Sequence, residues 1–254
     1  MSQPRIRPVP TPSEKPGPRP SRGVLGVSNQ NLYSLSNSPV DPALISEDFI
    51  AGCRALLITG THLSQPTVRA ASQAALGYAG QHGVLRVLDI DYRPVLWGLT
   101  SPGLGERRFV PSSAVTAQLQ AVLGLCDLVV GTEEELHIAG GSTDSRRALA
   151  AMRAVSGALI VMKRGSMGCL AFDGPLPADI EHGLQGPGFP VEVFNVLGAG
   201  DAFMAGLLRG WVRDEPLPQA LRYANACGAL VVSRHGCAPA MPSWAELEGF
   251  LGHG

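Results

Sequence analysis

The stretch that decides the fold of this chain is Val193-Phe-Asn-Val-Leu-Gly-Ala-Gly-Asp-Ala-Phe-Met-Ala-Gly206, in which an extended apolar run leads into a glycine turn and then a helix. The two glycines of this turn, Gly198 and Gly200, permit unusual backbone angles and close approach by a ligand. The N–H groups of such a turn, with those of the first helical turn, form a binding place for an anion. The segment therefore predicts an anion-binding turn with the Asp201 carboxylate at its rim.

Two common phosphate-binding motifs do not fit this segment. The Gly-x-Gly-x-x-Gly loop of dinucleotide-binding folds needs glycine where the chain has Phe203, and the Gly-Lys-Ser/Thr of a Walker loop is absent. The first mismatch argues against a Rossmann-type oxidoreductase. A carboxylate beside a phosphate site suits a general base that accepts a hydroxyl proton during phosphoryl transfer. The alternative is that Asp201 only caps its helix, and the spacing alone leaves both interpretations open.

Strand-like and helix-like segments alternate through most of the chain. Apolar runs predict strands at 54–59, 84–90, 127–130, 158–162 and 169–172, and longer segments predict helices at 65–82, 113–125, 132–139, 143–155, 200–212, 217–233 and 243–251. This alternation predicts a doubly wound, mainly parallel sheet with helices on both faces. Ligands of such sheets bind beyond the carboxyl ends of the strands, where the glycine turn is expected to lie.

Composition narrows the classes of function. Apolar residues make up 45% of the 254 residues, which is enough for a substantial core, and the formal net charge of -1 gives no reason to expect nucleic acid or a membrane surface as partner. No apolar stretch is long enough for a transmembrane helix, and no secretory signal is evident. The five cysteines lie far apart without a Cys-x-x-Cys pair. These features predict a reduced, cytoplasmic protein that acts on a small molecule. Whether copies associate as a homo-oligomer is left open.

The N-terminal region has a different composition from the remainder. Residues 1–23 are dominated by Pro, Ser and Arg, and almost nothing in them can be buried. Such a segment cannot recover its ordering entropy. We therefore expect a disordered, Pro-rich leader over residues 1–40 and a folded domain over residues 41–254.

Separated motifs in the folded part resemble one family of enzymes. The run from Asn195 to Phe203 resembles the C-terminal signature of the ribokinase-like (PfkB) sugar kinases, which usually reads Asp-Thr-x-Gly-Ala-Gly-Asp-x-Phe. Other family landmarks follow in the right order: Asp89–Trp97, with Asp91 in place of Asn; Val130–Glu135, with Gly131 in place of the Asn of Asn-x-x-Glu; Lys163–Gly168; Ala224–Ala229; and Ser233–Pro239. The resemblance implies a ribokinase-like fold.

The phrases Thr59–His62 and Gly140–Asp144 add a narrower resemblance to the 5-dehydro-2-deoxygluconokinases of inositol catabolism. It implies transfer of the γ-phosphate of ATP, with Mg²⁺, to a hydroxyl of 5-dehydro-2-deoxy-D-gluconate in myo-inositol catabolism. Family members begin with strands and a lid that should precede the region matching residue 45, and no such features occur here. We therefore expect a kinase fold that lacks the N-terminal strands and the lid. The alternative is an inactive truncated remnant, or a nucleotide-binding module of the same fold.

The resemblance also implies roles for individual residues. Asp201 would be the catalytic base, and Gly198, Ala199 and Gly200 the anion hole. Contacts to the nucleotide would involve Lys163, Gly165, Gly168, Asn225 and Ala238; Asp91 and Arg93 would lie on the substrate or phosphate side; and Glu134 would help to organise magnesium. Simpler interpretations stay open: a helix cap for Glu134, a surface position for Lys163, a loop ion pair for Asp91 and Arg93, and an internal partner for Asn225. Lys163 is of interest because it is one of only two lysines in the chain, with Lys15.

Overall fold

The structure is a computed structural model that describes residues 40–101 and 109–252. The predicted leader, apart from Val40, lies outside the described residues. Within the described ranges, no helix is both long and apolar enough to cross a membrane.

Six strands form a single sheet in the order β1-β2-β3-β4-β5-β6. The strands are β1 (Ala55–Thr59), β2 (Leu85–Asp89), β3 (Leu128–Thr132), β4 (Leu159–Lys163), β5 (Cys169–Phe172) and β6 (Leu184–Gly186). The first four run parallel, whereas β5 and β6 are antiparallel additions. The mainly parallel sheet expected from the alternation of segments is confirmed.

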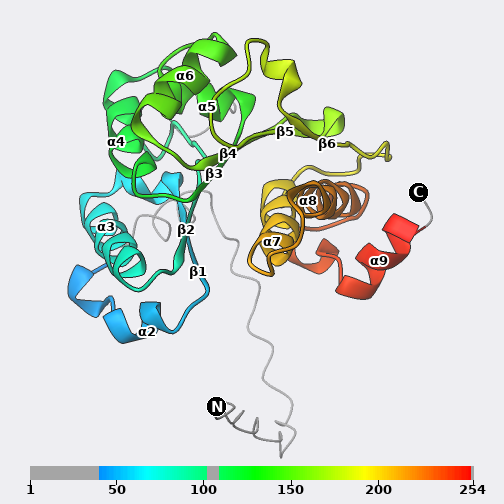
Figure 1. Cartoon of the computed structure of the whole chain (residues 1–254), viewed down its shortest axis with the longest axis horizontal. Helices are drawn as coiled ribbons and strands as arrows, with labels where there is room; N and C mark the ends of the chain where they lie inside the picture. The colour runs from blue at the N-terminus through cyan, green and yellow to red at the C-terminus, as the bar shows by residue number, and fades with distance from the viewer. Residues whose placement is uncertain (1–39, 102–108, 253–254) are drawn as a thin grey trace, which may run out of the picture.

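One face of the sheet is covered by the helices that connect the parallel strands (Figure 1). These are α3 (Pro66–Gln81), α4 (Ser113–Leu123), α5 (Glu133–Gly140) and α6 (Ser145–Val155), with the short α2 (Glu47–Ala51) packed on α3. Leu76, Leu119 and Leu149 of these helices are buried against alternate strand residues such as Leu88 and Ile160. A parallel strand buried on both faces reads as a continuous apolar run, which is the pattern of the central strands β3 and β4.

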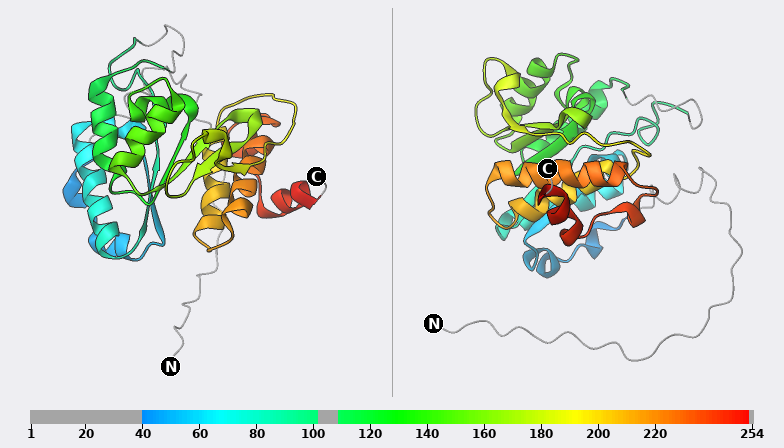
Figure 2. Two further views of the ribbon diagram at one scale, coloured as in Figure 1. Left: turned by 45° about the horizontal axis from the view of Figure 1, so that its top comes forward. Right: turned by 90° about the vertical axis from the view of Figure 1, so that its right-hand side faces the viewer.

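The opposite face is covered by α7 (Ala199–Trp211) and α8 (Leu217–Val232). Phe203 and Leu207 of α7 pack on strand residues that include Val87 and Val161. The two helices lie very close together, since a Cβ on Gly206 would stand 2.7 Å from the carbonyl oxygen of Tyr223. Beyond them lies α9 (Trp244–Gly252), which packs on α8 away from the sheet (Figure 2). Helices on both faces are therefore confirmed.

Short 3-10 helices complete the secondary structure: η1 (Pro42–Leu44), η2 (Gly60–Ser64), η3 (Gly165–Met167), η4 (Ile180–His182) and η5 (Ala238–Ala240). The predicted strands and helices all occur, with ends displaced by one or two residues. Among the α-helices and strands of the described residues, α2 and β6 were not predicted, and neither were the 3-10 helices. The apolar run before Gly198 is not a strand of the sheet: it is fixed by the amides of Phe194 and Asn195, which donate to the carbonyl of Val232.

The amino ends of β2 and β3 are joined by an ion pair. Arg86 donates from Nη2 to Oδ1 of Asp127 over 2.7 Å and from Nε to Oδ2 over 3.0 Å, and its backbone N–H also donates to Oδ2 over 2.8 Å. A bidentate guanidinium–carboxylate pair of this kind is among the stronger ionic contacts. It fixes the ends of two neighbouring strands.

Candidate active site

Some of the residues singled out in the sequence, namely Lys163 and the turn from Gly198 to Asp201, lie where the carboxyl ends of β2 and β4 meet the first turn of α7. Alternate strand residues face α7: on β2 these are Val87 and then Asp89, and on β4 they are Val161 and then Lys163. The apolar members of each series pack under the middle of α7. Asp89 and Lys163 therefore lie under its N-terminal turn.

The turn before α7 has the conformation that its glycines suggested. Gly198 is the N-cap, with φ 85° and ψ -1°, which is a left-handed conformation that favours glycine. The amides of Gly200 and Asp201 have no acceptor among the described residues, as expected for two of the free N–H groups of a helix start. Asp201 is exposed, and its carboxylate makes no hydrogen bond or ion pair within the described part of the chain. Free donors and a free carboxylate thus share one turn.

A second loop is fastened to this turn through Asn195. Its Nδ2 donates to the carbonyl of Gly236 over 2.7 Å, while its Oδ1 accepts from the amide of Leu197 over 2.7 Å. A Cβ on Gly198 would stand 2.6 Å from Sγ of Cys237, so the two loops touch closely. The neighbouring Ala238, expected at the nucleotide, is exposed beside the turn.

Lys163 is the cation of this site. Its Nζ lies 3.3 Å from Oδ1 of Asp89 and 3.9 Å from Oε2 of Glu135. A Cβ on Gly200 would stand 3.6 Å from the same nitrogen. The ammonium therefore lies between two acidic side chains and the start of α7, and a surface position for Lys163 does not apply because only 13% of its side chain is exposed.

Burial and charge shift the pKa values of this pair. Burial lowers the pKa of Lys163, but the charges of Asp89 and Glu135 outweigh it, so the pKa lies above its usual value. Burial raises the pKa of Asp89 to about 6, although the Lys163 ammonium acts in the opposite direction. Lys163 is therefore charged at neutral pH, and Asp89 loses its proton on approach to neutrality.

The acid that faces the cluster is Glu135, whereas Glu134 is exposed on the outside of α5. Glu135 completes a capping box with Thr132: its Oε2 accepts from the backbone N–H of Thr132 over 2.6 Å, and its own N–H donates to the threonine hydroxyl. Its Oε1 also accepts from the amide of Tyr92 over 3.3 Å. The Thr-x-x-Glu spacing of a capping box could have identified Glu135 from the sequence.

Asp91 follows β2 in a strained conformation. Its φ of 33° is unusual for a residue other than glycine, and backbone outliers of this kind cluster at functional sites. Oδ2 of Asp91 accepts from the hydroxyl of Thr61 over 2.9 Å, and Oδ1 lies 3.2 Å from Nε of Arg93. The predicted pair of Asp91 and Arg93 thus forms an ion pair at the same edge of the sheet, next to β1.

The other residues expected to contact the nucleotide are Gly165, Gly168 and Asn225, and their positions are set mainly by the fold. Gly165 (φ 58°) and Gly168 (φ 84°) form the turn between β4 and β5, and a Cβ on Gly168 would overlap the carbonyl of Gly186. Asn225 is buried on α8, where its Nδ2 donates to the carbonyl of Leu221 and to Sγ of Cys169. The structure gives Asn225 an internal partner, so only its Oδ1 has no donor among the described residues.

A magnesium ion would depend on few protein ligands. Within the described residues, no three His, Cys, Asp or Glu side chains gather closely enough to enclose a metal ion. Mg²⁺ is usually held by one or two carboxylates together with substrate phosphates and water. A magnesium role for Glu134 would need phosphates and water as the remaining ligands, since its exposed carboxylate lies on the outside of α5 and Glu135 is the acid that faces Lys163.

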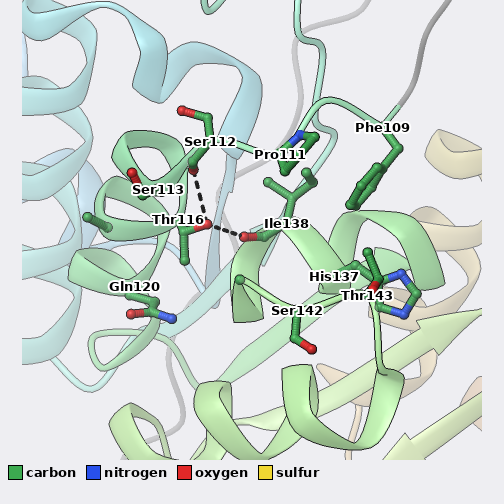
Figure 3. Close-up of a pocket in the computed structure, with 12 residues that line it drawn as sticks. Phe109, Pro111, Ser112, Ser113, Thr116, Gln120, His137, Ile138, Ser142 and Thr143 are labelled. Atoms are coloured by element: carbon green, nitrogen blue, oxygen red, sulfur yellow. Dashed lines mark hydrogen bonds between the residues drawn. The ribbon is translucent and has the colours of Figure 1, made fainter.

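A pocket elsewhere on the surface contains none of the predicted site residues. It lies between α4 and α5 and is drawn in Figure 3. Its lining comprises Phe109, Pro111, Ser112, Ser113, Thr116, Ala117, Gln120, His137, Ile138, Gly141, Ser142 and Thr143. Thr116 and Gln120 donate to the carbonyls of Ile138 and Ala139, so part of its polar lining is used to end α5.

The mainly parallel sheet, with a glycine turn and helix start at the carboxyl ends of its strands, is the arrangement that the motifs led us to expect. The profile of the pfkB family of carbohydrate kinases matches residues 106–244, which is more than half of the chain, and the chain belongs to this family. The family expectation drawn from the motifs is confirmed.

Curated relatives carry a more particular name. The 5-dehydro-2-deoxygluconokinase of Geobacillus kaustophilus (strain HTA426) is 31% identical over 222 residues, which is 86% of this chain and 61% of the relative. The 5-dehydro-2-deoxygluconokinase of Bacillus thuringiensis (strain Al Hakam) is 32% identical over 225 residues, with shares of 86% and 62%. The chain thus spans about 61% of the length of the curated relatives it matches.

Solved structures agree on the fold. The aminoimidazole riboside kinase of Salmonella enterica, solved with aminoimidazole riboside and an ATP analog, superposes with a TM-score of 0.67 at 23% identity over 84% of this chain and 66% of that one. The fructokinase of Vibrio cholerae O395 gives a TM-score of 0.66 at 25% identity, with shares of 82% and 64%. The ribokinase-like fold is therefore confirmed.

Proposed function

We propose that the protein is an ATP-dependent sugar kinase. The observation that carries the proposal is the start of α7, where two free backbone amides and the free carboxylate of Asp201 share one turn and the ammonium of Lys163 lies beside Gly200. Phosphoryl transfer is catalysed mostly by positioning and by stabilising charge on the transferred group. These are the components that such a reaction needs.

The roles of the chain's own residues follow from their positions. Asp201 accepts the proton of the acceptor hydroxyl as that oxygen bonds to the γ-phosphorus and the bond between this phosphorus and the β–γ bridging oxygen of ATP breaks. The amides of Gly198, Ala199 and Gly200 surround the anion hole, although the Ala199 amide is already 3.3 Å from the carbonyl of Val196. Lys163 balances charge on the phosphates, and ADP leaves with the electrons of the broken bond.

Nucleotide and metal contacts complete the proposal. Gly165 and Gly168 shape the turn after Lys163, Ala238 lies on the adjoining loop, and Asn225 would contact the nucleotide only through its free Oδ1. Mg²⁺ held by Glu134 would neutralise phosphate charge when it is bound with ATP.

The acceptor we propose is 5-dehydro-2-deoxy-D-gluconate, an intermediate of myo-inositol catabolism. The support is the name carried by relatives at about 31% identity over most of this chain. Asp91 and Arg93 lie at the same edge of the sheet as Lys163, and the Arg93 side chain is about half exposed, so it can meet an anionic substrate.

The test is a coupled assay of ADP formation with ATP, Mg²⁺ and the sugar acid. We expect acceptor-dependent turnover that falls about 10²–10⁴-fold in Asp201→Asn, the usual contribution of a general base. Asp214→Asn is a matched control at the opposite end of α7, where the exposed Asp214 has a φ of 58° that asparagine also accepts.

Loss of turnover in Asp201→Asn but not in Asp214→Asn supports the proposal. If the folded wild-type chain forms no ADP with any sugar or sugar acid, the kinase proposal fails. ATP binding without turnover would instead support the alternative of a nucleotide-binding module.

A further inference from the structure

A buried acid next to Lys163 has no part in the reaction described above. Asp89 is only 8% exposed, and among the described residues its carboxylate makes one hydrogen bond, at 3.3 Å with Nζ of Lys163. Burying an ion pair rarely adds stability, because the cost of removing two charges from water is close to the attraction gained. A buried acid with one partner therefore needs a reason beyond packing.

The strand register explains how the two side chains meet. Val130 of β3 pairs with Asp89 of β2, and Val161 of β4 pairs with Val130. Lys163 lies two residues farther along β4, on the same face of the sheet. Its flexible stem bends back across β3 toward Asp89, which leaves the ammonium beside Gly200 at the start of α7.

The ammonium has donors to spare in this position. A lysine carries three N–H donors, and Lys163 makes one hydrogen bond within the described residues, to Asp89. Glu135 lies at 3.9 Å, beyond hydrogen-bond distance, and its two oxygens already accept from the amides of Thr132 and Tyr92. Asp89 is thus the acid that is free to hold Lys163.

We propose that Asp89 is a positioning residue, which holds Lys163 as a protonated cation with its spare donors directed at an anion bound to the first turn of α7. The inference rests on the proposed function in that the anion would be the phosphate of ATP. Without a counter-charge, a lysine this deeply buried tends to lose its proton and with it the charge that binds phosphate.

The charged groups around the pair are few, so the effect of removing Asp89 can be isolated. Glu135 of α5 and Asp91 after β2 are the other acids that act on Lys163, while α7 contributes the backbone of Gly200. Asparagine at position 89 keeps the shape and the acceptor oxygen but removes the charge. We therefore expect the pKa of Lys163 to fall by at least one unit in Asp89→Asn.

The chain is well suited to a direct measurement, because Lys15 and Lys163 are its only lysines. Only the neutral amine reacts with acetic anhydride, so the rate of acetylation of each lysine as a function of pH reports its pKa. Peptide mass spectrometry separates the two sites, and Lys15 serves as a reference amine in the same sample. The variants are compared by the pH at which the acetylation rate is half of its maximum. A change in the exposure of the lysine alters the maximal rate but not this midpoint.

We expect the Lys163 midpoint to move down by at least one pH unit in Asp89→Asn, which is about a tenfold rise in rate at fixed pH below the midpoint. Asp89→Glu keeps the charge and should leave the midpoint within about 0.5 unit of wild type. Asp127→Asn removes a partly buried acid at the other end of the sheet and should not move it. An unchanged midpoint in a folded Asp89→Asn protein would overturn the proposal.

Addition of ATP separates this proposal from the proposed function. If ATP slows acetylation of Lys163 but not of Lys15, the contact between Lys163 and phosphate is supported. If ATP has no effect and the midpoint still shifts in Asp89→Asn, the phosphate contact fails while the dependence of Lys163 on Asp89 stands. If ATP protects Lys163 and the midpoint does not shift, only the role of Asp89 fails.

Discussion

The two ends of the sheet use charged residues in opposite ways. At the amino end, Arg86 and Asp127 satisfy each other through a bidentate contact with distances of 2.7 and 3.0 Å. At the carboxyl end, Lys163 has one hydrogen bond for its three donors, and the carboxylate of Asp201 has no partner among the described residues. A complete ion pair has little left to offer a ligand. The incomplete cluster keeps donors and an acceptor available, which is what a binding site requires.

The largest effect is expected on kinase turnover, when one glycine at each end of the sheet is replaced by alanine. In Gly198→Ala, the φ of 85° is strained and the new Cβ would stand 2.6 Å from Sγ of Cys237, so the anion-binding turn must shift. We expect kinase turnover to fall about 100-fold, the cost of a misplacement of about 1 Å. Gly83→Ala is the control, since Gly83 precedes β2 with a φ of 66° and open space around it. Equal turnover in the two variants would contradict the comparison.

The next effect is on the pH dependence of stability. The pKa of Asp89 in the folded protein is about 6, above its usual value, so its folded form holds a proton between about pH 4 and 6 that the unfolded chain has lost. Stability from this group is present at low pH and is lost as the pH rises through that window. Urea unfolding should show the advantage of wild type over Asp89→Asn shrinking by roughly 2 kcal/mol between pH 4 and 7. If the stability advantage of wild type over Asp89→Asn grew as the pH rose, the raised pKa of Asp89 would be refuted.

The contribution of Asp127 to stability should change with pH in the opposite direction, and at lower pH values. Burial raises its pKa, but the hydrogen bonds and charge of Arg86 outweigh this and hold the pKa below its usual value. Its contribution is therefore present above about pH 4 and lost as the pH falls further. At pH 7 we expect Asp127→Asn to lower the free energy of unfolding by roughly 1–2 kcal/mol, because the pair is only partly buried. The affinity of Asp127→Asn for ATP should stay unchanged. A tenfold loss of that affinity would mean that the amino end of the sheet is part of the binding site.

The smallest effect concerns the capping box of α5. Glu135→Gln keeps both hydrogen bonds of the box but has no second oxygen for the amide of Tyr92, whereas Glu135→Ala loses the bonds accepted from the amides of both Thr132 and Tyr92. We expect Ala to lower the free energy of unfolding by about 1 kcal/mol and Gln by less than half of that. Thermal unfolding of the two variants measures the difference. Equal losses would mean that the charge of Glu135, rather than its hydrogen bonds, stabilises this end.

Sequence patterns predicted the fold well because each of the strands β1 to β5 is a short, mostly apolar run. The run before Gly198 was harder, since it is extended without pairing in the sheet and is held by the carbonyls of Val232 and Gly236. The three-residue strand β6 has too little apolar content to be recognised. Both depend on contacts with distant parts of the chain, which periodicity does not contain.

The site was predicted in part. The glycine turn and Asp201 follow from local sequence, and Lys163 drew attention by its rarity. Glu135 was missed because aligning Gly131 with the family's asparagine directs attention to Glu134, whereas the capping box of Thr132 turns Glu135 inward. Asp89 was missed because its role depends on a lysine two strands away. Such pairings arise from the register of the sheet.

The claim that the carboxyl end binds phosphate while the amino end is structural is tested most directly by ATP titration of two matched variants. Lys163→Met and Arg86→Met each replace a cation with an uncharged side chain of comparable apolar length. We predict that Lys163→Met weakens ATP binding by about 10–100-fold, the value of a charge-assisted hydrogen bond, and that Arg86→Met stays within about twofold of wild type. Unchanged affinity in folded Lys163→Met, or a comparable loss in Arg86→Met, would contradict the account.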